Sequence, residues 1–423
     1  MTSIAHPSLR GHPTRRVASR WSMPGTATGT SWVLAALVTV LNMIGLVMVM
    51  SASAVVSVRE DGIPWTYFQQ QIVWTFLGTI GLLVAMSVSL DFWRRRARLL
   101  LGISVATLVA VVVPGVGVTN NGATRWLAVG PVQVQPSEFV KFALLLFVAD
   151  LLARREHRID DWRWGLAPVL TYLVLIGALI MAQPNLGTTI IIGLTTLAVL
   201  WAAGTPSRPL AATAGVFALC AGLFVAIEPF RRKRYMAFLN PMSDPYGDGL
   251  QNVQSLVAMA NGGLLGRGLG RSTVKWGFLP FAWTDFIFAV IGEEFGLLGA
   301  MTVVFLFVAF AALGAYIASQ AADRFSMLVA VGITTWISVQ AFLNMAAVVG
   351  VVPITGVPLP FISYGGSSML VTLTAVGMLM NIARHPASRP ADGVNSAGRR
   401  GRTRQGGGGV GRERARTKNG VTH

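Results

Sequence analysis

Three carboxylates stand close together where a polar stretch meets an apolar one, in the segment LPFAWTDFIFAVIGEEFG that begins at Leu279. Asp285 comes directly before the apolar residues, and Glu293 and Glu294 follow two helical turns later. An acid in or beside a membrane-spanning helix is costly, so it marks a functional site by default, and the chemistry open to it is proton transfer. Asp is also a common cap at a helix N-terminus. The sequence therefore leaves two roles for Asp285, which can coexist.

Basic residues in the long polar stretch 229–284 are candidates for binding an anionic group. They are Arg231, Arg232, Lys233, Arg234, Arg267, Arg271 and Lys275. Glycines in this stretch allow close backbone approach to a ligand, and Arg forms paired hydrogen bonds with phosphate. We therefore favour an anionic, lipid-borne ligand that Arg267 and Lys275 help to bind. Long loops also cross membranes whatever their charge, so simple tolerance of these cations is the alternative.

A second polar stretch, NGATRWLAVGPVQVQPSEFVKF, places Arg125 beside Trp126 and begins a helix near Pro136. Glu138 and Lys141 lie one turn apart on the same face of that helix. A lysine inside a spanning segment needs a partner or a water-filled cavity. Arg125, Glu138 and Lys141 are therefore candidates for binding substrate, and a pair that only stabilises its own helix is the alternative for the last two.

A third polar stretch, VVGVVPITGVPLPFISYGGSSML, precedes and enters the last apolar segment. Its prolines exclude a helix, and polar groups at this depth need protein, water or ligand partners, so we expect it to line a cavity. Its substrate-binding candidates are Ser363, Tyr364, Gly365, Gly366 and Ser367. Four amide side chains could face the same interior or form ordinary interhelical hydrogen bonds. They are Gln183, Asn185, Gln340 and Asn344.

Composition predicts the elements that must position these residues. Hydrophobic residues make up 53% of the 423 positions and charged residues 12%, and the mean hydropathy is +0.60, which indicates a polytopic, all-α membrane protein. Apolar segments of roughly 18 to 25 residues follow one another and predict about ten spanning helices. We place them at 32–56, 72–90, 98–117, 136–153, 166–183, 186–203, 209–228, 285–318, 326–350 and 363–383.

Charge predicts the orientation of these helices. Lys and Arg gather in alternate loops, such as 94–98 and 154–158, whereas the loops at 57–70 and 351–359 hold almost none. Because cytoplasmic loops carry the excess of cations, both termini are expected on the cytoplasmic side. Asp285 and the three polar stretches then lie on the outer side.

We divide the chain into a basic cytoplasmic tail at 1–31, a ten-helix membrane domain at 32–384 and a second basic tail at 385–423. The domain includes the long outer loop at about 229–284. The second tail is rich in Gly and Arg and is expected to be disordered and attracted to anionic lipid. Its cations are not interleaved with aromatic residues, so we expect no binding to nucleic acid.

Thiol and metal chemistry find little support in the sequence. Cys220 is the single cysteine, which excludes an internal disulfide, and it is expected to be a small buried hydrophobe. We expect no metal site built from His and Cys ligands. A divalent cation, Mg²⁺ or Mn²⁺, would have to be held by carboxylates and substrate phosphates.

The motifs quoted above, together with QPNLGT, resemble successive signatures of the shape, elongation, division and sporulation family, to which FtsW and RodA belong. The resemblance runs from about Trp32 to Arg384. The family's members are ten-span glycosyltransferases that polymerise lipid II into peptidoglycan in the bacterial cytoplasmic membrane, together with a class B penicillin-binding protein as the transpeptidase. The LPFISYGGSS form is more similar to FtsW than to RodA, which implies work at the division septum with other division proteins.

The resemblance also implies roles for single residues. The family's essential outer acid corresponds to Asp285, its conserved arginine to Arg125, and its Pro-x-Glu-x-x-Lys pair to Glu138 and Lys141. Asp285 would be the general base for the attacking sugar hydroxyl, and cations would stabilise the departing diphosphate. This chain departs from the many relatives that have Pro-Glu-Ala-His before Thr-Asp, because Phe281 and Trp283 replace the acid and the imidazole.

Other functions compete with this one. A transporter that flips lipid II would also use charges inside the spans and a cavity. A RodA-type polymerase of the elongating wall is the nearer alternative. A scaffold that only recruits division proteins does not explain the intramembrane charges.

Overall fold

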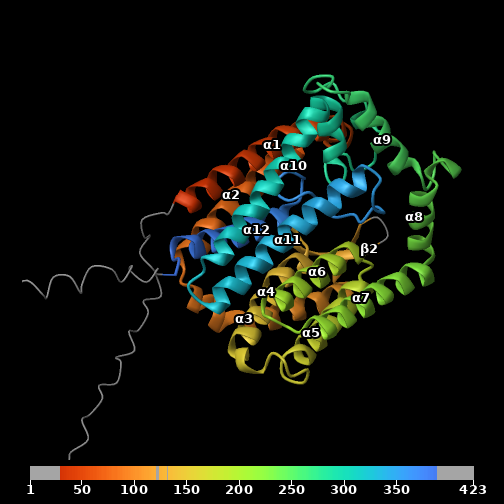
Figure 1. The fold of residues 1–423 in the computed structure, drawn as a ribbon. Coiled ribbons are helices and arrows are strands. Elements are labelled where there is room, and N and C mark those ends of the chain that lie inside the picture. The colour runs from red at the N-terminus through yellow and green to blue at the C-terminus, as the bar shows by residue number, and fades with distance from the viewer. Residues whose placement is uncertain (1–28, 121–122, 131, 388–423) are drawn as a thin grey trace, which may run out of the picture. The chain divides into compact units, whose positions relative to one another are not determined.

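The computed structural model describes residues 29–120, 123–130 and 132–387, and Figure 1 shows their arrangement as a bundle of long helices. Each predicted segment corresponds to a helix, because backbone groups in lipid must satisfy their hydrogen bonds within the segment. These helices are α1 (Gly29–Asp61), α2 (Thr66–Ser87), α3 (Leu90–Val112), α4 (Pro136–Arg154), α5 (Leu166–Ala182), α6 (Leu186–Ala202), α7 (Ser207–Ile227), α10 (Ile287–Ser319), α11 (Arg324–Val348) and α12 (Gly366–Arg384). The all-α prediction is confirmed.

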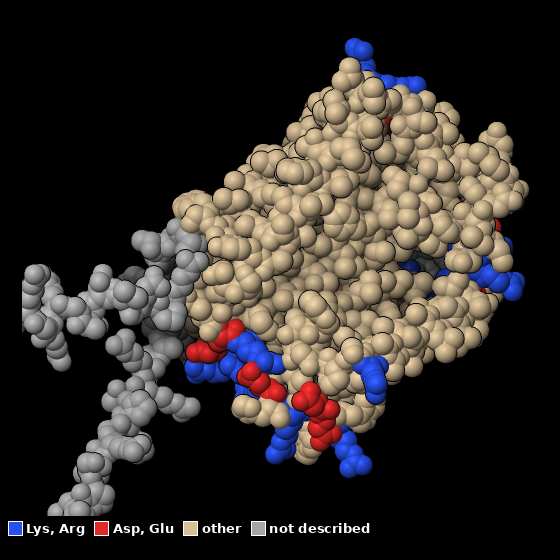
Figure 2. Space-filling view, in the orientation of Figure 1, with Lys and Arg blue, Asp and Glu red and all other residues tan. Residues whose placement is uncertain are grey.

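Six of these helices are long and apolar enough to cross a membrane, namely α1, α2, α7, α10, α11 and α12. α5 and α6 are shorter apolar helices. In Figure 2 a wide surface without charges separates charged side chains at the lower edge from others near α8 (Pro229–Leu239) and at the top. The chain is a multi-pass membrane protein. The count of ten crossings and the cytoplasmic position of both ends stay predictions, and residues 1–28 and 388–423 of the two predicted tails lie outside the described residues.

The predicted outer loops contain more regular structure than expected. A three-stranded antiparallel sheet connects α3 to α4, in the order β1 (Gly117–Asn120), β2 (Ala123–Val129) and β3 (Val132–Val134). The loop between α7 and α10 holds α8 and α9 (Leu250–Gly262), with the short turns η2 (Pro241–Ser243) and η3 (Val274–Trp276). α9 carries apolar residues with a helical spacing, and it buries Asn252, Ser255, Ala258 and Gly262. The turn η1 (Glu156–Arg158) lies between α4 and α5.

Small residues allow the helices near the site to pack closely. A Cβ at Gly377 of α12 would lie 2.2 Å from the Leu82 carbonyl oxygen of α2, and one at Gly78 would lie 2.6 Å from the Leu373 side chain. Backbones approach one another in membranes where glycine faces the interface. The N-terminus of α12, which carries the SYGGS residues, is thereby fixed against α2.

α7 contributes little to the packed interior, and this overturns the prediction for Cys220. Within this helix only Thr213 is buried, and Cys220 is exposed. α7 packs mainly against α6 before it leads into α8. Because one apolar helix can face lipid on most of its circumference, an apolar run does not show which side chains lie inside the protein.

Candidate active site

Asp285 lies just before α10 and does not cap it. The helix begins at Ile287, its N-cap residue is Phe286, and no side chain makes a capping hydrogen bond there. The capping interpretation is therefore wrong. The Asp285 side chain is half-buried, and a Cβ at Gly356 would lie 3.7 Å from its Oδ2 atom. The carboxylate consequently faces the loop that joins α11 to α12.

That loop fixes the backbone around Asp285. Asn344 of α11 donates from Nδ2 to the Asp285 carbonyl at 2.7 Å and to the Val357 carbonyl at 2.8 Å. Ser363 donates from Oγ to the Thr284 carbonyl at 2.5 Å and accepts from the backbone N–H of Leu359 at 2.8 Å. Ser363, a predicted substrate-binding residue, is thus buried and used for positioning. Sequence reasoning gave Asn344 no such role.

Arginine side chains from two elements face Asp285. The positive charges of Arg234 of α8 and Arg125 of β2 favour the ionised form of Asp285, so they lower its pKa. Arg125 donates from Nε to the Gln183 carbonyl at 3.0 Å and also to the Pro184 carbonyl, which fixes it against the turn between α5 and α6. In Figure 2 a hollow beside α8 contains basic atoms. Asp285 and Arg125 are thus near enough for their charges to interact.

The cations of this cluster repel one another. Burial lowers the pKa of Arg125, and the neighbouring Arg234 lowers it further, against the opposing effect of Asp285. Burial likewise lowers the pKa of Arg231, with Arg125 and Arg234 adding to the effect and Glu228 opposing it. Three guanidinium groups held close together in a partly buried site favour an anionic ligand, because its charge relieves their repulsion.

The protonation of Asp285 suits proton transfer near neutral pH. Burial raises its pKa to about 6, against the opposing charges of Arg234 and Arg125. A general base works best when its pKa lies close to the working pH. Asp285 is therefore ionised at neutral pH, yet basic enough to take a proton.

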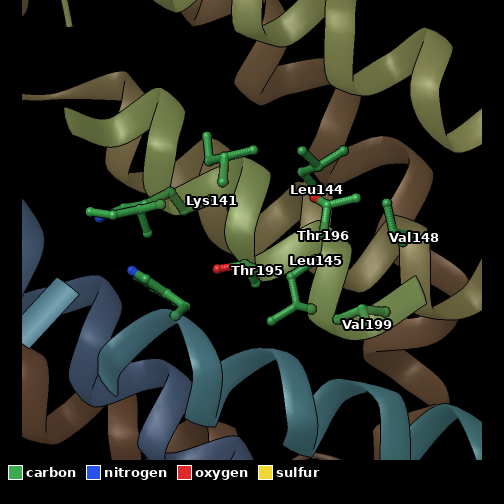
Figure 3. A pocket seen from close by; sticks show the side chains of 10 residues that line it. Lys141, Leu144, Leu145, Val148, Thr195, Thr196 and Val199 are labelled. Atoms are coloured by element: carbon green, nitrogen blue, oxygen red, sulfur yellow. The ribbon is translucent and has the colours of Figure 1, made fainter. Parts of the chain in front are cut away.

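Glu138 and Lys141 form the predicted ion pair, at 2.8 Å between Lys141 Nζ and Glu138 Oε1. Both are buried, and Lys141 also donates to Gln340 Oε1 at 2.9 Å and stacks on the Trp336 ring. Gln340 in turn donates to the Pro358 carbonyl at 2.9 Å. Figure 3 shows Lys141 and Thr195 beside a small cavity between α4, α6 and α11. Through Gln340, the pair therefore supports the loop between α11 and α12 that Asp285 faces.

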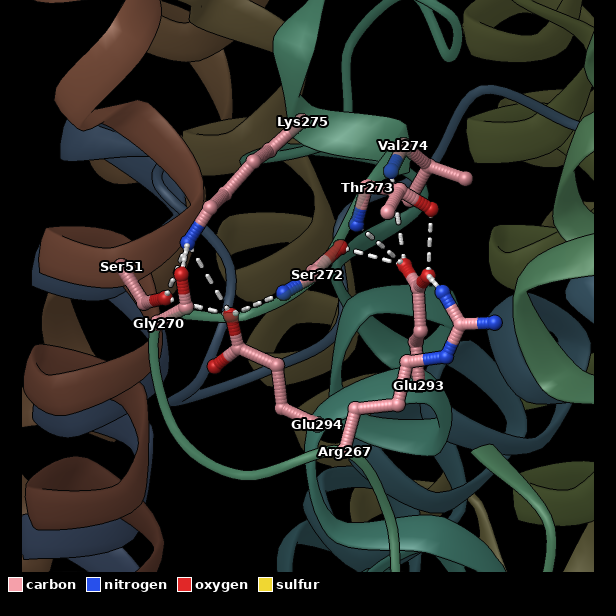
Figure 4. Close-up of polar contacts among 9 residues, drawn as sticks. All are labelled: Ser51, Arg267, Gly270, Ser272, Thr273, Val274, Lys275, Glu293 and Glu294. Carbon is pink, nitrogen blue, oxygen red and sulfur yellow. Dashed lines mark hydrogen bonds and ion pairs between the residues drawn. The ribbon is translucent and has the colours of Figure 1, made fainter. Parts of the chain in front are cut away.

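Arg267 and Lys275 pair with the two glutamates of α10 (Figure 4). Arg267 lies 3.5 Å from Glu293 and Lys275 lies 3.2 Å from Glu294. Glu293 also accepts hydrogen bonds from Ser272 and Thr273, and Glu294 from Ser51 of α1 and the Ser272 backbone. This glutamate network fastens the glycine-rich loop after α9 to α10, near the break in the helix at Gly296.

The remaining SYGGS residues make contacts that join α12 to its neighbours. Tyr364 donates its phenol hydroxyl to Gln70 Oε1, and the Gly365 N–H reaches Gln71 Oε1 at 3.4 Å. A Cβ at Gly366 would collide with the Trp74 indole at 2.2 Å. The Ser367 hydroxyl accepts from the Gln135 N–H at 3.0 Å, ahead of α4.

Among the cations of 229–284 that the sequence offers as anion-binding candidates, Arg231 and Arg234 are the ones whose charges act on Arg125 and Asp285. The run of four cations after Pro229 was a signal for them, but spacing could not show which of those cations turn toward Asp285. No three His, Cys, Asp or Glu residues come together to hold a metal ion within the described ranges.

Comparison with known proteins identifies the family. Residues 31–388 match a family model described as "Cell cycle protein", which groups FtsW, RodA and SpoVE. The chain belongs to this family. Two FtsW/RodA/SpoVE relatives show the extent of the match. Probable peptidoglycan glycosyltransferase FtsW of Mycobacterium tuberculosis is 41% identical over 88% of this chain and 71% of that protein, and stage V sporulation protein E of Bacillus subtilis is 39% identical over 85% and 98%.

Solved structures share the fold of this chain. A chain from "Structural coordination of polymerization and crosslinking by a peptidoglycan synthase complex" aligns with a TM-score of 0.70 and 28% identity over 84% of this chain and 97% of that chain. The rod shape determining protein RodA of Thermus thermophilus aligns with a TM-score of 0.63 and 25% identity over 85% and 98%. The resemblance that the sequence motifs predict is confirmed.

Proposed function

We propose that this protein is a peptidoglycan glycosyltransferase that polymerises lipid II at the outer face of the bacterial cytoplasmic membrane, with Asp285 as its general base. This class of activity agrees with the name of the FtsW relative, a probable peptidoglycan glycosyltransferase. One observation carries the residue assignment. A half-buried carboxylate faces Arg125 and Arg234, so a base and an anion-binding site lie together.

The reaction joins two lipid-linked sugars. The 4-hydroxyl oxygen of the acceptor N-acetylglucosamine bonds to the anomeric carbon of the donor N-acetylmuramic acid, and its proton passes to Asp285. The bond from that carbon to the diphosphate oxygen breaks, and its electron pair leaves with undecaprenyl diphosphate. One carboxylate suffices, because a diphosphate leaves without needing a proton.

The departing diphosphate needs stabilisation of its negative charge. We assign this to Arg125, Arg231 and Arg234, whose mutual repulsion favours an anion at that position. Arg267 and Lys275 are engaged by the glutamate network, so we assign them to holding the outer loop. The contacts of Glu138, Lys141 and Ser363 support a positioning role for those three residues.

The cofactor and the protein partner are assigned by class and not by individual contacts. A divalent cation, if the reaction uses one, would be held by carboxylates and substrate phosphates, because Mg²⁺ and Mn²⁺ prefer oxygen ligands. The similarity to a chain of a peptidoglycan synthase complex supports a penicillin-binding protein as partner, and we propose a class B transpeptidase. We also propose a place at the division septum, with other division proteins, which the family's description as a cell cycle protein favours.

The test is polymerisation of purified lipid II by the full chain in liposomes, with the transpeptidase present. Asp285→Asn and Asp285→Ala should insert and fold as the wild type does but lose glycan synthesis. Removing a general base costs about 10² to 10⁴ in rate. Asp61→Asn, which changes an exposed acid at the end of α1, is the control and should keep full activity. Wild-type rates in Asp285→Asn would remove Asp285 as the base.

The same liposomes separate the enzyme from a flippase. Lipid II placed in the outer leaflet alone is a complete substrate for a polymerase that acts there. Glycan synthesis under these conditions requires no transport, whereas movement of lipid II between leaflets without any polymer would favour the transporter.

A further inference from the structure

Aromatic side chains from three parts of the chain meet around the segment that precedes Asp285. The Tyr67 ring of α2 lies 5.6 Å from Trp283 and 5.1 Å from Tyr364, measured between ring centroids. Phe281 lies 6.3 Å from Trp283. We call Tyr67, Trp283 and Tyr364 the aromatic cluster. Two of the rings come from segments that also build the site, one just before Asp285 and one just before α12.

The rings of the aromatic cluster are held in fixed orientations. Tyr67 donates its hydroxyl to Glu60 Oε2 at 2.5 Å, and Tyr364 donates to Gln70. The Tyr364 N–H donates to the Trp283 carbonyl at 3.0 Å. All three rings stay half-buried, and Glu60 and Gln70 are exposed beside them. The result is a set of rigid aromatic surfaces with polar groups at the rim.

A membrane-interface belt is the ordinary explanation for aromatic residues at helix ends. Belt residues face headgroups singly and need neither mutual contact nor unusual backbone. Here the rings contact one another, and Phe281 has a φ of 60°, a strained conformation for an aromatic residue. Such strain gathers at functional sites.

The chemistry of the cluster fits a sugar ring. A pyranose presents apolar C–H faces to aromatic surfaces and hydroxyls to carboxylates and amides, whereas a diphosphate would select the cationic side of the site. Binding sites for small molecules combine aromatic walls with a few fixed polar groups. The arginines come from β2 and α8, while the aromatic rings come from α2 and the segments before Asp285 and α12.

We propose that the aromatic cluster is the subsite for sugar rings of the growing glycan, and that it holds the strand beside Asp285. This inference rests on the proposed polymerase function. It gives the two chemical parts of the substrates separate recognition: cations bind the departing diphosphate, and aromatic rings bind the neutral sugar rings of the strand.

The first experiment measures binding without catalysis. A lipid-free, four-sugar peptidoglycan fragment is titrated by saturation-transfer NMR against full-length Asp285→Asn protein in nanodiscs. Added Tyr67→Leu or Trp283→Leu should weaken binding about three- to tenfold, and Tyr67→Phe, which keeps the ring, should not. The matched control is Trp276→Leu, because Trp276 is 59% exposed in the same outer loop and lies outside the cluster.

The outcomes separate this inference from the polymerase function. No binding of the fragment to the Asp285→Asn protein, unchanged binding in both leucine variants, or an equal loss in Trp276→Leu would overturn the subsite. Each of these results can occur while the wild-type chain still polymerises lipid II. Thermal unfolding of each variant shows that lost binding does not reflect lost fold, and Tyr67→Leu, compared with Tyr67→Phe, carries the test if Trp283→Leu fails to insert.

Discussion

Arg234 should set the pH range in which Asp285 can act. The base must be ionised, so activity falls as the pH drops through its pKa, which burial raises to about 6. Arg234 is the largest charge that opposes this rise. Arg234→Gln should therefore raise the pKa of Asp285 further. Loss of a neighbouring opposite charge is typically worth about one pH unit or more, which moves the acid limb to about pH 7.

The size of the effect depends on pH in a defined way. With the midpoint moved from about 6 to about 7, the ionised fraction of Asp285 falls about twofold at pH 7 and about fivefold at pH 6. Weaker binding of the diphosphate in Arg234→Gln would lower the activity by a further factor that does not depend on pH. The two contributions are separated by the position of the acid limb, not by the rate at one pH.

The assay is kcat/KM for lipid II polymerisation in liposomes between pH 5 and pH 8. Lys233→Gln is the matched control, because it removes an exposed cation from the adjacent position of α8. The reasoning is refuted if the acid limb of Arg234→Gln stays at the wild-type position, or if Lys233→Gln moves it equally.

Three further outcomes follow from contacts around the site. Lys141→Met leaves Glu138 buried without its cation and should lower the free energy of unfolding by about 3–5 kcal/mol, measured by SDS titration in mixed micelles; a loss below about 1 kcal/mol contradicts this. Asn344→Leu removes both amide donors that hold the backbone at Asp285, so kcat should fall up to about a hundredfold with KM little changed, and an unaltered kcat excludes the positioning role. Gly296→Val strains a residue with a φ of 68° and places a Cβ 2.4 Å from a backbone nitrogen of the loop after α9. This contact should displace the loop, so limited proteolysis should cleave it faster than in the wild type.

The helices could be predicted from sequence because their cause is local. A long apolar run in lipid has no better option than an α-helix, so each predicted segment appears as a helix. The pairing of Glu138 with Lys141 was equally predictable, since both lie on one face of one helix. The sheet between α3 and α4 was not, because its short strands carry a weak signal and are fixed by pairing with one another.

The sequence alone determined that Asp285 stands where a polar stretch meets an apolar helix of a membrane protein, with cations before it along the chain, and it predicted the outer side for this acid. Only the tertiary structure decided which cations face it. Arg125 and Arg234 do, from β2 and α8, whereas Lys275 pairs with Glu294 near the break in α10. Residues far apart in sequence meet through the packing of helices, and a list of charges contains no information about that packing. The same reason explains why Cys220 faces outward although its surroundings in sequence are apolar.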